Sequence, residues 1–288
     1  MNGLKIAIPN KGRMSEDIFA LLKQAGLNFS SKSERTLSVK TYDGLYEIIF
    51  VRTKDIPNFV HSGVCDIGFT GQDIVNESEL EVEDILALDF GKCTMVVAVK
   101  DEESYKTVAD LPDGIKVATS FPNVAKKHFA KFGKNVEVAK VEGATEIMPR
   151  MGLVDAIVDI TSSGSTLKAN KLRIIGEIFD SSAVIIGRPN LKKEAPEEIE
   201  ALIRAIKSAI DARDKKYLMA HIPKNVLNEV KNFLPGLSSP TVTTLYGNDE
   251  AVVIHVVVDK NKVYESIDKL KSLGASGILI MTVDQMIQ

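Results

Sequence analysis

Short apolar runs rich in β-branched residues alternate with stretches of helical periodicity over the first two thirds of the chain. The apolar runs predict strands at residues 4–8, 46–51, 66–70, 94–99, 115–119, 155–160 and 183–186. Apolar residues spaced three or four positions apart predict helices at residues 14–25, 124–132 and 144–151. This alternation is typical of parallel strands covered by helices, so it predicts an α/β fold.

A five-residue pattern occurs twice in this region. Residues 63–67 (Gly-Val-Cys-Asp-Ile) and 152–156 (Gly-Leu-Val-Asp-Ala) each follow a helix-like stretch and lead into a strand. Both strands then run into a polar loop with a glycine, at residues 70–73 and 161–166. Because ligands bind beyond the carboxyl ends of strands in α/β sheets, the repeat predicts two related lobes that face each other across a cleft. Chance similarity over five residues is the alternative.

The pattern changes after residue 195. A stripe of Ile and Leu residues at helical spacing predicts one long helix, with Pro196 in its first turn. The charged stretch 211–216 predicts a solvated hinge. Beyond it, the order strand, helix, strand (241–245), strand (251–258), helix, strand (277–281) predicts a ferredoxin-like βαββαβ domain. By analogy, an appended domain of this kind more often binds an effector than performs chemistry.

The length of 288 residues favours two or three compact units. We expect residues 1–95 with 178–210 to form one lobe, residues 96–177 the second lobe, and residues 211–288 the C-terminal domain. Lys and Arg (36) nearly balance Asp and Glu (39), which argues against a nucleic-acid partner. Two cysteines are too few for a disulfide framework. The absence of a long apolar stretch or secretory leader predicts a cytoplasmic protein without a membrane partner.

The strongest chemical signal follows the strand at 155–160. Five hydroxyl side chains surround one glycine there: Thr161, Ser162, Ser163, Gly164, Ser165 and Thr166. Main-chain amides and hydroxyls of such a turn can surround a phosphate, and Gly164 would let the backbone approach it closely. An ordinary helix-capping turn is the alternative. The spacings of a Walker A loop and of the glycine-rich dinucleotide fingerprint are both missing.

Asp159 stands at the carboxyl end of the same strand. There its carboxylate could accept hydrogen bonds from ribose hydroxyls. A purely structural aspartate would instead cap the loop through Thr161 or Ser162.

A second signal lies at the end of the first strand, where Lys11 and Arg13 flank a glycine before a helix whose cap would be Ser15. Arg52 follows the strand at 46–51 in the same way, and it is a further candidate for contact with phosphate. Gly71 and Asp73 would line the facing loop. Ordinary solvated surface charges are the alternative for the three cations.

Other reactive side chains show no catalytic or metal-binding pattern. The four histidines, His61, His128, His221 and His255, lack metal-ligand spacing, and we expect satisfied structural histidines. No Ser, His and acid set is evident, and Cys65 reads as a small buried hydrophobe.

Several segments together resemble the long form of the ATP phosphoribosyltransferase family, the first enzyme of histidine biosynthesis. They are residues 9–13 (Pro-Asn-Lys-Gly-Arg), 52–73, 121–123 and 141–172, with 234–236, 239–242 and 273–279 in the C-terminal part. The resemblance implies a two-lobed catalytic unit similar to periplasmic binding proteins, joined to an ACT-like regulatory domain that binds histidine. It also implies Mg²⁺ and a homo-oligomer, hexameric in the inhibited form.

The implied reaction is displacement at C1 of phosphoribosyl pyrophosphate by N1 of ATP, giving phosphoribosyl-ATP and pyrophosphate. On this resemblance the loop 161–166 holds the 5′-phosphate and Asp159 the ribose hydroxyls. Lys11, Arg13 and Arg52, with Mg²⁺, face pyrophosphate or the ATP phosphates. Glu142 orients the ribose or the metal, or else is a surface residue. The effector site is placed around Ser239, Thr241 and Ala275, and the metal ligands and adenine contacts stay unassigned.

Two other functions compete with this one. The first is a non-enzymatic sensor whose two lobes close on a small anion; an exported sensor should carry a signal sequence, and a transcriptional one a helix-turn-helix, and neither is evident. The second is a phosphoribosyltransferase with another acceptor, which would share residues 159–166 but not obviously the C-terminal domain.

Overall fold

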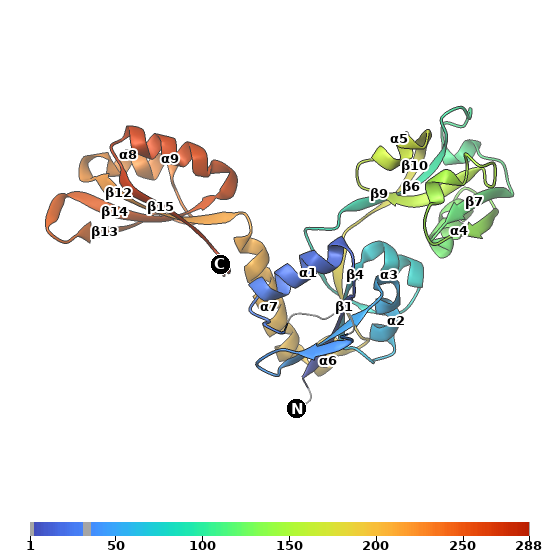
Figure 1. Ribbon diagram of the computed structural model, residues 1–288, viewed down its shortest axis with the longest axis horizontal. Helices are drawn as coiled ribbons and strands as arrows, with labels where there is room; N and C mark the ends of the chain where they lie inside the picture. The colour runs from blue at the N-terminus through green and yellow to red at the C-terminus, as the bar shows by residue number, and fades with distance from the viewer. Residues whose placement is uncertain (1–2, 31–35, 288) are drawn as a thin grey trace. The chain divides into compact units, whose positions relative to one another are not determined.

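The computed structural model describes residues 3–30 and 36–287, which form three sheets with flanking helices (Figure 1). Contacts divide the chain into two compact units. The first comprises residues 1–20 and 28–199, and it contains two of the sheets. The second comprises residues 21–27 and 200–288, and it contains the third sheet.

The first sheet of the first unit, with its helices, is called lobe I. Its strand order is β2 (Ser38–Lys40), β3 (Tyr46–Val51), β1 (Leu4–Pro9), β4 (Ile67–Gly71), β11 (Ala183–Gly187) and β5 (Glu83–Ala87). β3, β1 and β4 are parallel, whereas β11 runs antiparallel to β4. Cys65 lies fully buried in the core of this lobe, where burial raises the pKa of its thiol to about 11. The thiol is therefore protonated and inert, as the sequence predicts.

The second sheet and its helices form lobe II. Its strand order is β10 (Leu172–Ser181), β6 (Cys93–Lys100), β9 (Ala156–Thr161), β7 (Ile115–Thr119) and β8 (Val136–Lys140). β9, β7 and β8 are parallel, and β6 is antiparallel to β9. Helix α4 (Pro122–Ala130) covers the sheet and buries Phe129 completely in a cluster with Met95 and Val97. The chain crosses from lobe I to lobe II before β6 and returns after β10.

The two lobes share one topology, which confirms the internal repeat. β3-β1-β4-β11-β5 and β8-β7-β9-β6-β10 follow the same order, with β4 and β9 in equivalent places. Asp66 and Asp155, the aspartates of the repeated pattern, make the same contact. The amide of Lys5 donates to Asp66 Oδ2 at 2.8 Å, and the amide of Lys116 donates to Asp155 Oδ2 at 3.0 Å. The aspartate thus ties the start of β4 to β1 in lobe I and the start of β9 to β7 in lobe II.

All seven strands predicted for lobes I and II are present, and within the residues that the structure describes these lobes have four further strands that were not predicted. These four, β2, β5, β8 and β10, are edge strands with half-exposed or alternating side chains, which leave a weaker apolar run. The remaining helices of lobes I and II are α1 (Arg13–Gln24), α2 (Ile56–His61), α3 (Gln72–Ser78), α5 (Ser165–Ala169) and α6 (Leu191–Glu194).

The predicted helix at residues 144–151 is wrong. Only a short 3₁₀ turn, Thr145–Ile147, forms there, followed by further turns. In a helix, Pro149 would lack an amide donor and its ring would clash with the preceding turn. Ala144 adopts a left-handed conformation at φ 52°, which a right-handed helix does not accept. The apolar spacing therefore builds a looped wall and not a helix.

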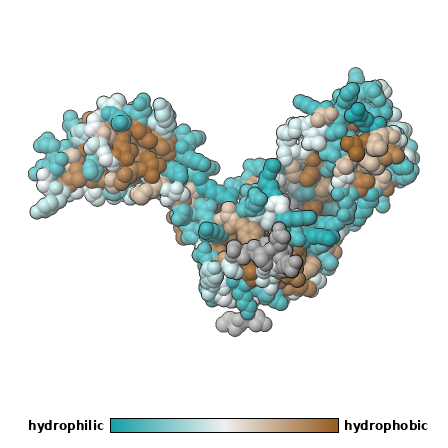
Figure 2. All heavy atoms as spheres, in the orientation of Figure 1, coloured by the Kyte–Doolittle hydropathy of each residue, from teal (hydrophilic) through white to brown (hydrophobic). Residues whose placement is uncertain are grey.

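The second unit confirms the βαββαβ domain. Its elements are β12 (Lys215–Pro223), α8 (Leu227–Phe233), β13 (Thr241–Leu245), β14 (Asn248–Asp259), α9 (Val263–Ser272) and β15 (Ser276–Thr282), after the long helix α7 (Pro196–Ala212). The sheet order β13-β14-β12-β15 is antiparallel throughout. Alternate residues of the strands, such as Leu218 and Ile254, pack against the two helices. A band of hydrophobic residues is visible on this domain in Figure 2 (left).

The predicted hinge at residues 211–216 is shorter than expected. α7 continues to Ala212 and β12 begins at Lys215, which leaves two residues between them. Lys215 pairs with Asp259 of β14 in the sheet, and its Nζ also lies 2.6 Å from Asp259 Oδ1. The domain boundaries expected from the sequence stay a prediction. Within the described residues, the helices lack the length and apolar character needed to cross a membrane.

Candidate active site

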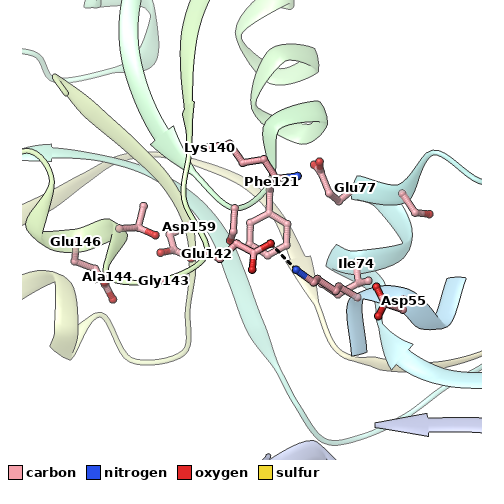
Figure 3. Close-up of a pocket in the computed structure, with 14 residues that line it drawn as sticks. Asp55, Ile74, Glu77, Phe121, Lys140, Glu142, Gly143, Ala144, Glu146 and Asp159 are labelled. Carbon is pink, nitrogen blue, oxygen red and sulfur yellow. Dashed lines mark hydrogen bonds and ion pairs between the residues drawn. The ribbon is translucent and has the colours of Figure 1, made fainter. Parts of the chain in front are cut away.

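A cavity of about 690 Å³ lies between lobe I and lobe II, beyond the carboxyl ends of their parallel strands (Figure 3). Lobe I contributes Lys54 and Asp55, which follow β3. Lobe II contributes Phe121, Glu142 and Asp159. The volume is typical of a small-molecule site, and charged groups of both signs line it. Of the site residues expected from the sequence, Asp159 and Glu142 line this cavity.

An ion pair joins the two sides of the cavity. Lys54 Nζ lies 2.5 Å from Glu142 Oε1, and both side chains remain substantially exposed. The hydrogen bond from Lys54 lowers the pKa of Glu142, and the charges of Lys140 and Arg52 act in the same direction. Glu142 is thus an ionised carboxylate surrounded by cations. Glu142 is exposed at the cavity surface, so its role in orienting the ribose or the metal stays a prediction.

Asp159 lies in β9, two residues before the strand ends, and is half-buried at the cavity wall. Its Oδ1 accepts a hydrogen bond from the amide of Ile160 at 2.8 Å. Burial raises the pKa of Asp159, and the charge of Glu146 adds to this, while bonds from the Ile160 amide and the Thr145 hydroxyl oppose it. The carboxylate thus faces the cavity. It does not cap the following loop, because the Thr161 hydroxyl accepts the loop's hydrogen bond from the amide of Gly164.

The loop 161–166 forms a tight turn into α5. Thr161 Oγ1 accepts a hydrogen bond from the amide of Gly164 at 2.9 Å, and the hydroxyls of Ser163 and Ser165 lie 2.9 Å apart. Gly164 has a φ of 69°, a left-handed conformation in which residues other than glycine are strained. The Ser and Thr side chains at 162, 163, 165 and 166 are exposed. The loop therefore presents hydroxyls to solvent near Asp159, while the amides of Gly164 and Ser165 bond to hydroxyls within the loop.

The three predicted cations gather at the edge of the lobe I sheet. β1 and β3 are parallel with Pro9 opposite Val51, so the residues that follow them are neighbours. This register places Asn10 beside Arg52, with Lys11 and Arg13 one and three residues further along the chain, and all three cations are exposed. Helix α1 begins at Arg13, two residues before the predicted cap; the Ser15 hydroxyl instead donates to the carbonyl of Pro9 at 2.8 Å.

Gly71 and Asp73 lie apart from the cavity lining. The Asp73 carboxylate is buried and accepts a hydrogen bond from the Ser181 hydroxyl at 2.8 Å. The main-chain amide of Asp73 donates to Ser181 Oγ at 3.0 Å. Burial raises the pKa of Asp73. A Cβ at Gly71 would lie 2.2 Å from Asp73 Oδ1, so only glycine fits beside this carboxylate. The structure places the pair against the strand that returns from lobe II.

The cavity also contains residues that sequence reasoning did not single out. They are Lys54, Asp55, Ile74, Glu77, Ser78, Ser120, Phe121, Lys140, Gly143, Ala144, Thr145 and Glu146. Lys54 and Asp55 lie two and three residues after Arg52. The argument that residues after a strand end line the site, which was used for Arg52, applies to them as well. No sequence pattern around Glu77 indicates a site, because the groups that it binds, the amides of Asn123 and Val124, belong to lobe II. Ser162, in contrast, faces a separate cavity lined by Lys92 and Asp180.

Comparisons with known proteins agree with this arrangement. A family model described as ATP phosphoribosyltransferase matches residues 52–208, and one described as the HisG C-terminal domain matches residues 212–285. The ATP phosphoribosyltransferase of Methanopyrus kandleri is 40% identical over 284 residues, which cover 99% of each chain. The chain belongs to the ATP phosphoribosyltransferase family. It is therefore an enzyme of histidine biosynthesis, a pentosyltransferase.

Two more relatives support this membership. The ATP phosphoribosyltransferase of Gemmatimonas aurantiaca is 41% identical over 291 residues, 99% of each chain. A solved structure titled as the ATP phosphoribosyl transferase (HisG:HisZ) complex from Thermotoga maritima matches with a TM-score of 0.65 and 31% identity. That match covers 72% of this chain and 98% of the other.

The C-terminal domain has a cavity of its own, of about 410 Å³. Ser239 and Thr241 line it together with Tyr217 and His255, whose Oη and Nδ1 lie 2.9 Å apart. The structure thus brings two of the three expected effector residues together. Ala275 lies outside this lining, half-buried against the core in the turn before β15.

The histidines agree only in part with expectation. His61 ends α2 and lies 2.8 Å from the carbonyl of Glu81, and His255 lies in β14 beside Tyr217. His128 differs, because its ring is buried on α4 and neither nitrogen has a partner among the described residues. Burial lowers the pKa of His128, so the ring is neutral. The expectation of a satisfied histidine is wrong there.

Proposed function

We propose that this ATP phosphoribosyltransferase transfers the phosphoribosyl group to N1 of ATP in the cavity between lobes I and II. The strongest support is the position of Asp159, at the cavity wall and two residues before the exposed hydroxyl loop. A phosphoribosyl group held by its 5′-phosphate at the loop would place its ribose beside this carboxylate. A location in the cytoplasm remains part of the proposal.

The reaction asks for positioning and electrostatics more than for a nucleophile. Displacing pyrophosphate at C1 develops positive charge on the sugar and negative charge on the leaving group. The amides and hydroxyls of residues 161–166 would hold the 5′-phosphate, and Asp159 would accept hydrogen bonds from the ribose hydroxyls. An ionised Asp159 near the ring would also stabilise the developing positive charge.

The cations of lobe I would hold the second polyanion. Lys11, Arg13 and Arg52 are exposed at one sheet edge, where they would face pyrophosphate or the ATP phosphates. Glu142 would orient the ribose or the metal, and its partner Lys54 would be an additional phosphate contact. These roles need both lobes, which explains a site built on two sheets.

Mg²⁺ is compatible with the donors in the cavity. Within the described ranges, no group of three or more His, Cys, Asp and Glu side chains is arranged to hold a metal ion. Mg²⁺ commonly binds through one or two carboxylates plus substrate phosphates, and the cavity offers Asp55 and Glu146 as such carboxylates. Because Asp55 is on lobe I and Glu146 is on lobe II, at opposite sides of Figure 3, we propose that one of them, together with substrate phosphates, holds Mg²⁺ carried by the substrate. Bound there, the ion would neutralise charge on the departing pyrophosphate.

The direct test mixes the protein with ATP, phosphoribosyl pyrophosphate and Mg²⁺ and searches for phosphoribosyl-ATP by mass spectrometry. Formation of the adduct with release of pyrophosphate supports the proposal. Binding without an adduct would favour the sensor. An adduct formed only with another base would favour a transferase with a different acceptor.

Replacing Arg13 by Ala is expected to raise the KM for a phosphate-bearing substrate. A charge-assisted hydrogen bond is worth about 1.5–3 kcal/mol, so the KM should rise at least about tenfold. Steady-state kinetics with each substrate varied in turn measure this. Arg204→Ala is the control, because Arg204 is an exposed helix residue whose partner is Glu200. Unchanged KM values for both substrates in Arg13→Ala would contradict the role.

We also propose that the C-terminal domain binds histidine as a feedback inhibitor and that the enzyme is a homo-oligomer, hexameric when inhibited. Histidine carries an ammonium, a carboxylate and an imidazole, which hydroxyls can bind. The cavity with Ser239 and Thr241 offers such hydroxyls, and Ala275 would contribute from outside this lining. Analytical ultracentrifugation with and without histidine tests the oligomer.

Thr241→Val is expected to weaken inhibition, because it removes a hydroxyl from this cavity without changing the side-chain shape. The loss of one hydrogen bond predicts an inhibition constant about 2- to 13-fold higher. Thr244→Val is the matched control, since Thr244 lies on the same strand but outside the cavity lining. Equal inhibition of both variants and the wild type would place the effector elsewhere.

A further inference from the structure

Helix α4 of lobe II begins without a capping residue of its own. Phe121 occupies the N-cap position and provides no side-chain acceptor, and Pro122 is the first helical residue. The amide of Ala125 donates to the carbonyl of Phe121 at 3.0 Å. The amides of Asn123 and Val124 have no acceptor within the helix, because first-turn amides point away from it.

Glu77 of lobe I supplies the missing acceptor. Its carboxylate accepts from the amide of Asn123 at 3.1 Å (Oε1) and 3.0 Å (Oε2), and from the amide of Val124 at 2.9 Å. The Asn123 side-chain amide donates to the Glu77 carbonyl at 2.9 Å. Figure 3 shows Glu77 reaching from α3 toward the green helix that follows Phe121. A carboxylate at a helix N-terminus is also favoured by the helix dipole.

The rest of α3 ties the same two lobes together. Asp73, in its first turn, bonds to Ser181 at the end of β10, where the chain returns from lobe II. Ile74 packs against the hydrophobic core of lobe II. α3 is therefore fastened at its start to the returning strand and near its end to α4, and Ile74, Glu77 and Ser78 line the cavity.

We propose that Glu77 is a positioning residue that latches lobes I and II in the arrangement that binds substrates. This inference rests on the proposed placement of both substrates in the cavity between the lobes. When the lobes separate, the Asn123 and Val124 amides lose their acceptor. Removing Glu77 therefore favours separated lobes, and the competent fraction of the enzyme falls.

The kinetic consequence differs from that of a catalytic defect. A ligand that needs the closed arrangement binds with an apparent affinity reduced by the competent fraction. Once substrates saturate the enzyme, the lobes are closed and the chemistry is unchanged. Glu77→Ala should therefore raise the KM for both substrates by about tenfold and leave kcat within about twofold.

The test uses three variants of the full chain. Glu77→Ala removes the acceptor, and Glu77→Gln keeps an acceptor oxygen without the charge. Glu79→Gln is the matched control: Glu79 is two residues away and also pairs across the lobes, with Lys127 of α4 at 2.5 Å, but both side chains are exposed and such a surface ion pair contributes little stability. Hydrogen exchange of the Asn123 and Val124 amides without substrates reports the contact directly. Steady-state kinetics report KM and kcat.

The expected result is faster exchange at both amides and a raised KM in Glu77→Ala, intermediate values in Glu77→Gln, and wild-type behaviour in Glu79→Gln. Unchanged exchange in Glu77→Ala would overturn the latch, as would faster exchange with unchanged KM values. A fall in kcat at constant KM would assign Glu77 to the chemistry instead. If the wild type makes no phosphoribosyl-ATP, the proposed function fails, and the exchange experiment still tests the latch separately.

Discussion

Asp159→Asn is expected to lower kcat/KM by about 10²–10³-fold, the range found when one preorganised electrostatic contact to a transition state is removed. The amide keeps the shape of the side chain but removes the charge that would face the ribose. Steady-state kinetics with both substrates measure the loss. Asp155→Asn is the control: Asp155 precedes the same strand, its carboxylate bonds to the Lys116 amide, and it lies outside the cavity lining. Wild-type turnover by Asp159→Asn would remove Asp159 from the mechanism.

The same variant is expected to keep or gain stability at neutral pH. Burial raises the pKa of Asp159 in the folded chain, so the folded state binds this proton more tightly than the unfolded state. The stability contributed by the protonated carboxyl is therefore present below the unfolded pKa of about 3.9 and is lost as pH rises through the higher folded pKa. Asparagine does not ionise and avoids this loss. Thermal unfolding at neutral pH measures it, and a lower midpoint for Asp159→Asn would contradict the burial argument.

Gly164→Val is expected to raise the KM for phosphoribosyl pyrophosphate by at least about 10²-fold, equivalent to losing one or two charge-assisted hydrogen bonds. A left-handed conformation costs an L-residue about 1–2 kcal/mol, and a β-branched side chain is disfavoured further. Since Gly164 has a φ of 69°, valine would force the turn to change. The bond from its amide to Thr161 would then be lost, and the amides would no longer converge on one phosphate.

Gly133→Val separates this effect from general strain. Gly133 has a φ of 66°, and a Cβ there meets nothing within 4 Å, which is also true at Gly164. It lies in the turn between α4 and β8, away from the cavity lining. Both variants should lose similar stability, but only Gly164→Val should lose affinity for the sugar phosphate. Equal kinetics in the two variants would show that residues 161–166 do not hold that group.

Much of the fold was predictable because near neighbours encode it. The seven strands are short stretches rich in apolar residues, and the Gly-x-x-Asp repeat predicted two related lobes before either sheet was known. The helix at 144–151 failed because apolar spacing outweighed Pro149 in the prediction. The edge strands were missed because half-exposed strands alternate with polar residues.

The candidate site, like the fold, was predictable from the sequence only in part. Lys11, Arg13, Arg52, Asp159 and the loop 161–166 were expected in the site because each stands at a strand end, and of these Asp159 lines the cavity. Parallel strands direct those ends to one edge of a sheet. Reading strand ends also suggested that Asp73 would line the facing loop, but the structure turns its carboxylate onto Ser181.

Local sequence thus determines the strands, the repeat and the turn at Gly164, because these depend on neighbouring residues and their spacing. The contacts that assemble the cavity depend on partners far along the chain. Glu77 and Asn123 are 46 residues apart, Lys54 and Glu142 are 88 apart, and Asp73 and Ser181 are 108 apart. Their meeting is decided by strand order and by the two crossings between lobes, and hydrophobic periodicity carries no information about which distant loops will be neighbours.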